Sequence, residues 1–306
     1  MNKIHRIVWS AVRGAFVVAH ECASGHGKPS STRVAAASLG LALLAGSAWA
    51  QPATNTLPTG GQVVGGAAAG SIATAGSAMT VTQNQQRMVA NWDSFSIGSA
   101  ASVHFQQPSG GVALNRVNGS QPSEIFGRLS STGSVFLINP NGVMFGPSAQ
   151  VDVGALTATT MKLSDSSFMA GSYAFTEGNG SVINQGQLTA QQQGYIALLA
   201  PEVRNEGVIS ASLGSVVLGG AEAVTLSHDS SGLHYAVDKG AVQALVDNKG
   251  LVQAEGGQVL LSARSANQLA SAVINNSGAI EAKGLINKGG RIVLEADSIT
   301  LQSGST

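Results

Sequence analysis

The hydrophobic residues in the second half of the chain recur in a repeated pattern that has no helical spacing. Each of four segments has an apolar start, an Asn, a Gly two positions later, and an apolar–polar–Ala run. The four are VINQGQLTA (182–190), VRNEGVISA (203–211), LVDNKGLVQA (245–254) and VINNSGAIEA (273–282). Glycine-led apolar strands follow them from Gly194, Gly214, Gly256 and Gly289. The pattern predicts many short strands joined by tight turns.

The spacing of these segments predicts a solenoid. Gly186 and Gly207 lie 21 residues apart, and the 43 residues from Gly207 to Gly250 are close to two such turns. The 28 residues from Gly250 to Gly278 fit one turn with an insertion. A period near 20 residues without a helical pattern is typical of a β-solenoid, whose coils bury their apolar faces against one another. Residues 51–306 would fill roughly 10–12 coils. Such a rod would be on the order of 50 Å long.

One residue type recurs at the predicted corners of the solenoid. Asn tolerates left-handed backbone geometry, and its side chain can stack in a ladder of amides from coil to coil. We therefore predict a structural role for Asn184, Asn205, Asn248 and Asn276.

The stretch FLINPNGVMFG, residues 136–146, places a strong turn signal inside the most apolar part of the chain. Pro140 fixes φ and lacks a hydrogen-bond donor, and Gly142 adopts conformations that other residues resist. The sequence predicts a corner between two buried strands here. The same apolar strands, while extended, could pair with the edge of a receptor sheet. The sequence leaves open whether the turn is only a corner or also a recognition element.

Two regions interrupt the rhythm. Residues 51–90 are predicted to form an N-terminal cap that covers the first open sheet edge, with the coils in 91–306. The polar and aromatic residues 157–180 predict an excursion from the rod, a hairpin around Ala170 and Gly171.

Composition supports the all-β prediction and identifies an export signal. The 39 glycines are poor material for a large helical domain. Lys28 and Arg33 precede an apolar run, Val34 to Ala45, which is too short for a membrane span of roughly 20 residues. Ala48 and Ala50 occupy the small-residue positions of a signal-peptidase site. We predict cleavage after Ala50, leaving Gln51 first; a retained membrane anchor is the alternative.

Removal of residues 1–50 changes the charge of the chain. Of 16 basic and 16 acidic residues, 11 and 15 remain, a net charge of −4. This charge argues against a nucleic-acid partner, which needs a basic face. The single cysteine, Cys22, also leaves, so the mature chain has no disulfide.

Enzyme and metal chemistry have little support in the sequence. His104, His228 and His234, with Asp229, match no compact metal-ligand spacing. Arg116 and Arg128 are isolated basic residues in separate predicted strands, unlike the clustered charged residues that a β-helix carbohydrate enzyme needs. We predict no enzymatic activity, no cofactor and no metal.

Several blocks of the chain resemble known families. NWDSFSIG (91–98), ALNRV (113–117) and FLINPNGVMFG, continuing through FMAGSYAF and GYIALLAPEVRNEG, resemble the secretion domain of two-partner secretion exoproteins such as the filamentous haemagglutinins. The family's second short motif, Asn-Pro-Asn-Leu, has no match here. Before the ordinary signal (28–50), residues 1–27 resemble the extended signal peptide region of large exported Gram-negative proteins, matching at Met1–Ile4, Arg6, Trp9, Arg13–Gly14 and Val18–Glu21.

The resemblance implies a fold, a route and partners. It implies a right-handed parallel β-helix with an N-terminal cap and an extra-helical hairpin. It also implies export by the Sec machinery and signal peptidase, followed by passage through an outer-membrane β-barrel transporter that carries periplasmic peptide-binding repeats. The secretion domain would then nucleate folding outside the cell. The implied recognition residues are Asn139, Pro140, Asn141, Gly142 and Val143.

Two alternatives remain at the level of sequence. The chain would be a haemagglutinin-like adhesin if the β-helix surface or the 157–180 excursion binds a host-cell ligand. It stops just after a predicted strand, at Leu301–Thr306, which fits a fragment, a truncated gene product or a short free-standing relative. An uncapped last coil is also an edge through which copies could associate.

Overall fold

The structure, a computed structural model, divides into two units, residues 1–50 and 51–306. It describes residues 5–10, 15–20, 51–64, 68–229, 232–267, 270–283 and 290–302. In the first unit, β1 (His5–Ser10) pairs antiparallel with β2 (Ala15–His20). Within the described part of the chain, no helix has the length and apolar character needed to cross a membrane. The predicted signal residues Ala48 and Ala50 lie outside the described residues.

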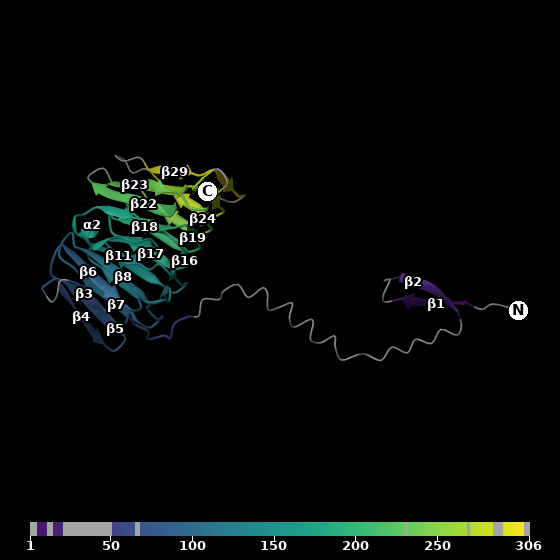
Figure 1. The fold of residues 1–306 in the computed structure, drawn as a ribbon, viewed down its shortest axis with the longest axis horizontal. Helices are drawn as coiled ribbons and strands as arrows, with labels where there is room; N and C mark the ends of the chain where they lie inside the picture. The colour runs from purple at the N-terminus through teal and green to yellow at the C-terminus, as the bar shows by residue number, and fades with distance from the viewer. Residues whose placement is uncertain are drawn as a thin grey trace. The chain divides into compact units, whose positions relative to one another are not determined.

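Residues 51–306 form a parallel β-helix whose coils each add one strand to each of three sheets (Figure 1). Sheet I contains β3 (Gln62–Val64), β6 (Arg87–Trp92), β8 (Val112–Val117), β11 (Ser134–Ile138), β14 (Ala155–Thr159), β18 (Tyr195–Ala200), β21 (Ser215–Gly220), β26 (Gln258–Ala263) and β29 (Arg291–Glu295). Sheet II contains β9 (Ser123–Ile125), β12 (Val143–Phe145), β16 (Ser181–Asn184), β19 (Glu202–Asn205), β24 (Gln243–Asn248), β27 (Ser271–Asn276) and β30 (Ser298–Leu301). Sheet III contains β4 (Gly70–Ala75), β5 (Ala78–Gln83), β7 (Ser102–Gln106), β10 (Arg128–Ser131), β13 (Gln150–Val153), β17 (Gln187–Ala190), β20 (Val208–Ala211), β25 (Leu251–Gln253) and β28 (Ala279–Glu281). The prediction of an all-β parallel β-helix is confirmed.

The number of coils is smaller than the sequence predicted. Among the described residues, sheet I has eight parallel strands, from β6 to β29. At about 4.8 Å per strand they make a rod roughly 35 Å long, shorter than expected. The difference arises because two long insertions and the N-terminal segment use residues that add no coil.

The larger insertion lies between Gly207 and Gly250, where the sequence suggested two coils. Val208 on β20 is instead in direct register with Leu251 on β25, so these glycines belong to adjacent coils. The intervening residues form an antiparallel hairpin of β22 (Ala223–Asp229) and β23 (Gly232–Lys239) outside the rod. A hairpin insertion of about one coil's length cannot be told from a second coil by spacing alone.

The other insertion, residues 160–180, is named the strap. It was predicted to be a hairpin starting at 157, but Ala155–Thr159 still belong to sheet I. The strap contains a short helix, α2 (Asp165–Met169), whose N-cap Ser164 accepts a hydrogen bond from the Ser167 amide, and a strand, β15 (Tyr173–Phe175). β15 pairs antiparallel with β22, so the strap and the later hairpin share one three-stranded sheet. The partner strand comes from a distant segment, which the local sequence does not reveal.

The N-terminal segment closes the first end of the rod. β3 pairs antiparallel with β6, and β4 pairs antiparallel with β5, so both sheets end in an antiparallel strand. β5 and β6 already pair in parallel with β7 and β8. The edges of the first coil are therefore covered.

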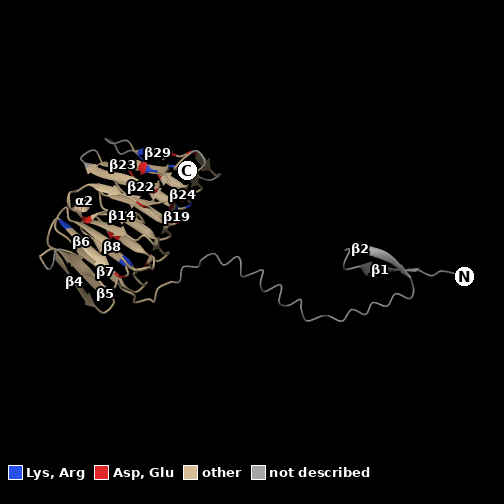
Figure 2. Cartoon of the chain, in the orientation of Figure 1, with Lys and Arg blue, Asp and Glu red and all other residues tan. Residues whose placement is uncertain are grey.

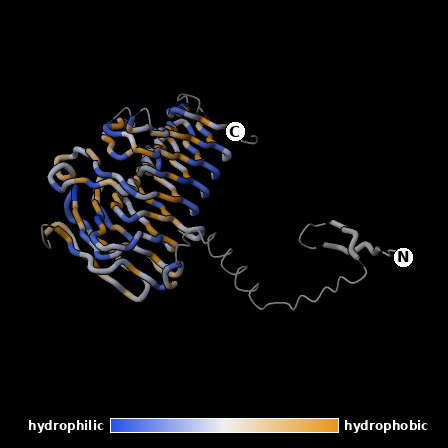
Figure 3. Tube along the Cα trace, turned by 45° about the vertical axis from the view of Figure 1, so that its right-hand side comes forward, coloured by the Kyte–Doolittle hydropathy of each residue, from blue (hydrophilic) through white to orange (hydrophobic). Residues whose placement is uncertain are grey.

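Apolar side chains form two cores. One fills the inside of the rod along its whole length, with Val103, Leu137, Ile196 and Leu261 among its members. The second lies between the outer face of sheet I and the sheet shared by the strap and the hairpin; its members include Leu114, Phe136, Phe168, Phe175 and Val224. From β11 to β21, sheet I is thus buried on both faces, whereas its end strands β3 and β29 are more exposed. Figure 3 colours the rod by the hydropathy of each residue. Burial on both faces accounts for continuous apolar runs such as Tyr195–Ala200.

The ladder predicted for the four corner asparagines is present, but none of them adopts the left-handed backbone geometry that the sequence suggested. The Asn184 side-chain amide donates to Asn205 Oδ1 (2.8 Å), Asn205 to Asn248 (2.7 Å), and Asn248 to Asn276 (2.7 Å). All four side chains are buried. Beside the ladder, a Cβ on Gly207 would lie 2.2 Å from the Gly186 carbonyl oxygen, which explains why glycine recurs there. Charged side chains flank the ladder: Lys249 Nζ lies 3.4 Å from Glu206 Oε1 and 3.1 Å from Asp247 Oδ2, and Figure 2 colours the charged residues of the rod.

Candidate recognition segment at the Asn-Pro-Asn-Gly turn

The Asn139–Gly142 turn connects β11 of sheet I with β12 of sheet II. The Gly142 amide donates to the Asn139 carbonyl at 3.1 Å, which closes a β-turn with Pro140 and Asn141 in the central positions. Asn141 is not among the residues with positive φ, so the turn is type I, with Pro140 in its favoured place. Gly142 has φ +119°, in the left-handed region, as the sequence predicted.

Asn139 anchors this corner to the preceding coil. Its side-chain amide donates to the Gln121 carbonyl at 2.9 Å and to Ser123 Oγ at 3.0 Å. Its side-chain oxygen accepts from the Asn141 backbone amide at 2.9 Å. The side chain is fully buried. Because each of its bonds replaces water inside the protein, Asn139 has a structural role in the folded chain.

The other motif residues differ in their exposure. Asn141 is exposed, and its side-chain amide donates to the Gly119 carbonyl at 2.8 Å. Pro140 is partly exposed, whereas Gly142 and Val143 are buried. Of the five predicted recognition residues, the folded chain therefore presents Asn141 and part of Pro140 to a partner.

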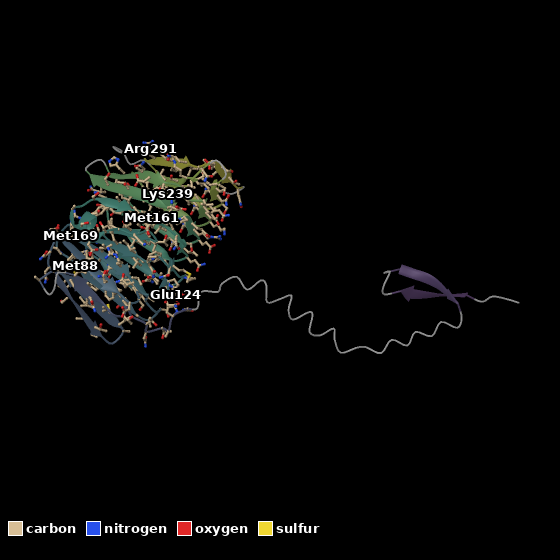
Figure 4. All side chains as sticks on the ribbon, viewed as in Figure 1. Met88, Glu124, Met161, Met169, Lys239 and Arg291 are labelled. Atoms are coloured by element: carbon tan, nitrogen blue, oxygen red, sulfur yellow. The ribbon has the colours of Figure 1, made fainter. Side chains whose placement is uncertain are left out.

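The strands on both sides of the turn are also covered. β11 lies between β8 and β14 of sheet I, and β12 lies between β9 and β16 of sheet II. Glu124 on β9 pairs in register with Met144 on β12 and is labelled in Figure 4. Its partial burial raises the pKa of its carboxyl group. Neither strand has a free edge. Another protein can pair edge-on with these strands only before the rod folds, while their edges are still free.

A cleft of about 660 Å³ lies next to the turn. The turn contributes Pro140 and Asn141, and the strap contributes residues 162–165 and Thr176. The cleft has a mixed lining, with apolar groups such as Leu163 beside the charged groups of Arg116 and Lys162.

The charged groups at this cleft are paired. Arg116 Nη2 contacts Asp165 Oδ1 and donates to the Leu163 carbonyl, both at 2.6 Å. Lys162 Nζ is 2.5 Å from Glu177 Oε2, and this exposed pair lowers the pKa of the Glu177 carboxyl group. Sequence reasoning treated Arg116 as an isolated basic residue. It missed the pair with Asp165 because the strap, which supplies the carboxylate, was expected to be a hairpin.

The remaining candidate groups are dispersed. His104 Nδ1 lies 2.9 Å from Ser130 Oγ on sheet III, and the His228 ring packs 5.7 Å from the Tyr195 ring. In the described residues, no three His, Cys, Asp or Glu side chains are grouped to hold a metal ion. Gln51, the predicted mature N-terminus, is exposed.

The geometry and the comparisons define the class of protein. The family model of the TPS (two-partner secretion) domain matches residues 53–306, and that of the extended signal peptide of the type V secretion system matches residues 1–50. The chain belongs to the two-partner secretion exoproteins, and it is exported through the periplasm of a Gram-negative bacterium to the cell surface or beyond.

Relatives and a solved structure agree with this family. Two heme/hemopexin-binding proteins of Haemophilus influenzae are 35% and 34% identical, covering 81% and 74% of this chain. The alignments span 28% and 27% of those proteins, so the chain corresponds to about a quarter of their length. The secretion domain of HMW1 from Haemophilus influenzae matches with a TM-score of 0.67 and 28% identity, covering 81% of this chain and 72% of that one. The family is one of secretion domains and not of enzymes.

Proposed function

We propose that residues 51–306 are recognised in the periplasm, in extended form, by a cognate outer-membrane β-barrel transporter with peptide-binding repeats. The segment FLINPNGVMFG is the proposed recognition element. The observation that carries this proposal is burial. Asn139, Val143 and both flanking strands are inaccessible in the rod, so a receptor that reads them must bind before folding.

Membership of the family supports the transporter as a partner, and the hydrogen bonds at the turn explain the residue types. The same Asn and Gly that would be read in the extended chain also build the corner afterwards. A variant can therefore fail to be exported because it is not recognised or because it does not fold. The experiment must separate these causes.

The test is secretion of the chain in a Gram-negative host, with and without the transporter. Asn141→Ala is the main probe, because its side chain is exposed and its loss affects folding least. We expect wild type in the medium only with the transporter, and Asn141→Ala retained in the periplasm although the purified variant folds. Normal export of Asn141→Ala would show that the turn is only a structural corner and not a recognition element. Export of wild type without the transporter would overturn the two-partner route.

Asn139→Ala needs a matched control for stability. Asn184→Ala also removes a buried amide that bonds between coils, but it lies outside the motif. If both variants lose similar stability and only Asn139→Ala is retained, the loss is one of recognition. Equal retention would assign the effect to folding.

We also propose that the Sec machinery exports the chain and that signal peptidase cleaves it after Ala50. The small residues at Ala48 and Ala50 and the exposed Gln51 support this site. Mass spectrometry of the secreted chain should find Gln51 first. A different first residue would move the site.

A second candidate function is adhesion to a host-cell ligand. The cleft beside the strap favours it, because a pocket of this size with mixed polar and apolar lining suits a ligand. Hemopexin, which the relatives bind according to their names, and host-cell surfaces are the probes. Binding that is lost in Lys162→Ala and kept in Lys249→Ala, which lies away from the cleft, would support adhesion; no binding would exclude these ligands.

A further inference from the structure

The strap reaches back to the first coil through Arg87, in addition to the apolar contacts of Val89. Arg87 Nη1 on β6 donates to the Tyr173 hydroxyl at 2.6 Å. The Arg87 guanidinium also lies over the rings of Phe168 and Tyr173, 5.9 and 5.8 Å from their centroids. A charged hydrogen bond and two cation–π contacts make this a specific attachment.

Apart from its attachment to Arg87, the strap covers the outer face of the first four coils. The Phe136 ring on β11 packs 5.8 Å from Phe168, 4.8 Å from Tyr173 and 6.2 Å from Phe175. Met161, at the start of the strap, is fully buried, whereas Met169 at the end of α2 is half exposed (Figure 4). Arg116 on β8 holds the middle of the strap through Asp165 and the Leu163 carbonyl.

All of these partners on the rod precede the strap in the chain. Arg87 and Tyr173 are 86 residues apart, a separation that is costly to close in an unfolded chain. Once β6, β8, β11 and β14 have stacked, however, their outer face already places Arg87 within reach. The surface that receives the strap is therefore complete once the fourth coil has formed.

The closed strap presents a sheet edge to the next insertion. β22 pairs with β15 on one side and with β23 on the other, in the register Tyr173↔Leu226 and Phe175↔Val224. An isolated two-stranded hairpin is at best marginally stable in water. The hairpin thus needs β15, and the outer face of sheet I beneath it, to become ordered.

We propose that the strap is a folding-order device: it locks the first four coils when Tyr173 meets Arg87, and it then templates the β22–β23 hairpin. The strap acts within the chain itself and goes beyond recognition by a transporter. Its action is measured on purified residues 51–306, which form one compact unit.

The test is pulse-labelling hydrogen exchange with mass spectrometry during refolding from denaturant. We expect peptides of β6, β8, β11 and the strap to gain protection together, before those of the hairpin. Protection of the hairpin before the strap would overturn the proposal.

Variants at the attachment sharpen the test. Tyr173→Phe keeps the ring and removes the hydroxyl, and Arg87→Met keeps the stem and removes the charge. In the folded chain Tyr173→Phe should raise amide exchange in β6 by about tenfold, and Arg87→Met should raise it further because it also removes the two cation–π contacts. The double variant should add little to Arg87→Met, because the hydrogen bond is already lost. Unchanged exchange in Tyr173→Phe, or effects that multiply in the double variant, would contradict a lock at this pair.

Thr225→Val is the matched control, because it removes a hydroxyl that donates to Asp238 Oδ2 at 2.7 Å between β22 and β23, in the hairpin instead of the strap. We expect it to raise exchange in β22 and β23 and to leave β6 unchanged. A rise in β6 of the same size would show that the hairpin, and not the strap, secures the first coils.

Discussion

The two halves of the rod are held together by different means. In the described residues, every fully buried phenylalanine and tryptophan precedes residue 176, among them Trp92, Phe95, Phe136 and Phe145. The later coils have smaller aliphatic residues inside and a ladder of four asparagines at one corner. In the register of sheet II, Phe145 is followed by Asn184, so the ladder begins where the aromatic side chains end.

This difference shows two solutions to the same stacking problem. The first coils differ from one another in their side-chain packing. One example is the edge-to-face contact of the Trp92 and Phe95 rings, whose centroids are 5.2 Å apart. The later coils repeat one corner, so each coil is fixed mainly by its neighbours. The first half should therefore respond strongly and locally to a change in volume, and the second half to a break in its repeated hydrogen bonds.

The largest effect is expected for Phe136→Ala. It removes the ring that joins sheet I to the strap, and such truncations of buried rings cost roughly 3–5 kcal/mol. Denaturant unfolding would measure the loss, and hydrogen exchange would locate it in β8, β11 and the strap. An unfolding free energy close to that of wild type would contradict the idea that the core between sheet I and the strap stabilises the first coils.

Asn205→Ala, in the middle of the ladder, should cost about 1–3 kcal/mol because the amides of Asn184 and Asn248 each lose a partner. Asn276→Ala, at the end of the ladder, should cost less, since it interrupts one bond between asparagines. Equal losses of unfolding free energy for the two variants would show that the ladder does not act as a chain of bonds.

Gly207→Ala should also destabilise the later coils, by roughly 1–3 kcal/mol, because its methyl group would meet the Gly186 carbonyl. Gly76 has φ +60°, but a methyl group there would have no other atom within 4 Å, so Gly76→Ala separates conformational strain from a clash. The thermal midpoint should fall further for Gly207→Ala. The reverse order would contradict close stacking at this corner.

The smallest effect concerns pH. Hydrogen bonds from Gln185, and the nearby Lys249, lower the pKa of the Glu206 carboxyl group below its ordinary value. The lowered pKa means that this stabilisation is present above the unfolded pKa, near 4.5, and is lost as pH falls through the folded pKa. The group is near the surface, so the change is below about 1 kcal/mol. Glu206→Gln should flatten this part of the stability–pH curve; an unchanged curve would exclude the contribution.

The same contrast explains what the sequence could predict. The later coils were visible in the repeats: Asn184 and Gly207 recur because each meets its equivalent in the next coil. The first coils have no such repeat, and their assignment depended on the family resemblance. The strap and the hairpin were misjudged because β15 pairs with β22 some fifty residues later, and spacing carries no information on that pairing. The turn at Asn139 was predictable, but its bonds to Gln121 and Ser123 were not.

The central claim is that the Asn-Pro-Asn-Gly segment is read before it is buried. Its most direct test is binding of the mature chain to the purified periplasmic repeats of the transporter, comparing chain freshly diluted from denaturant with chain that has already folded. We predict that the unfolded chain binds, that Asn141→Ala weakens this binding, and that the folded chain does not bind. Equal binding of the folded chain would contradict the claim.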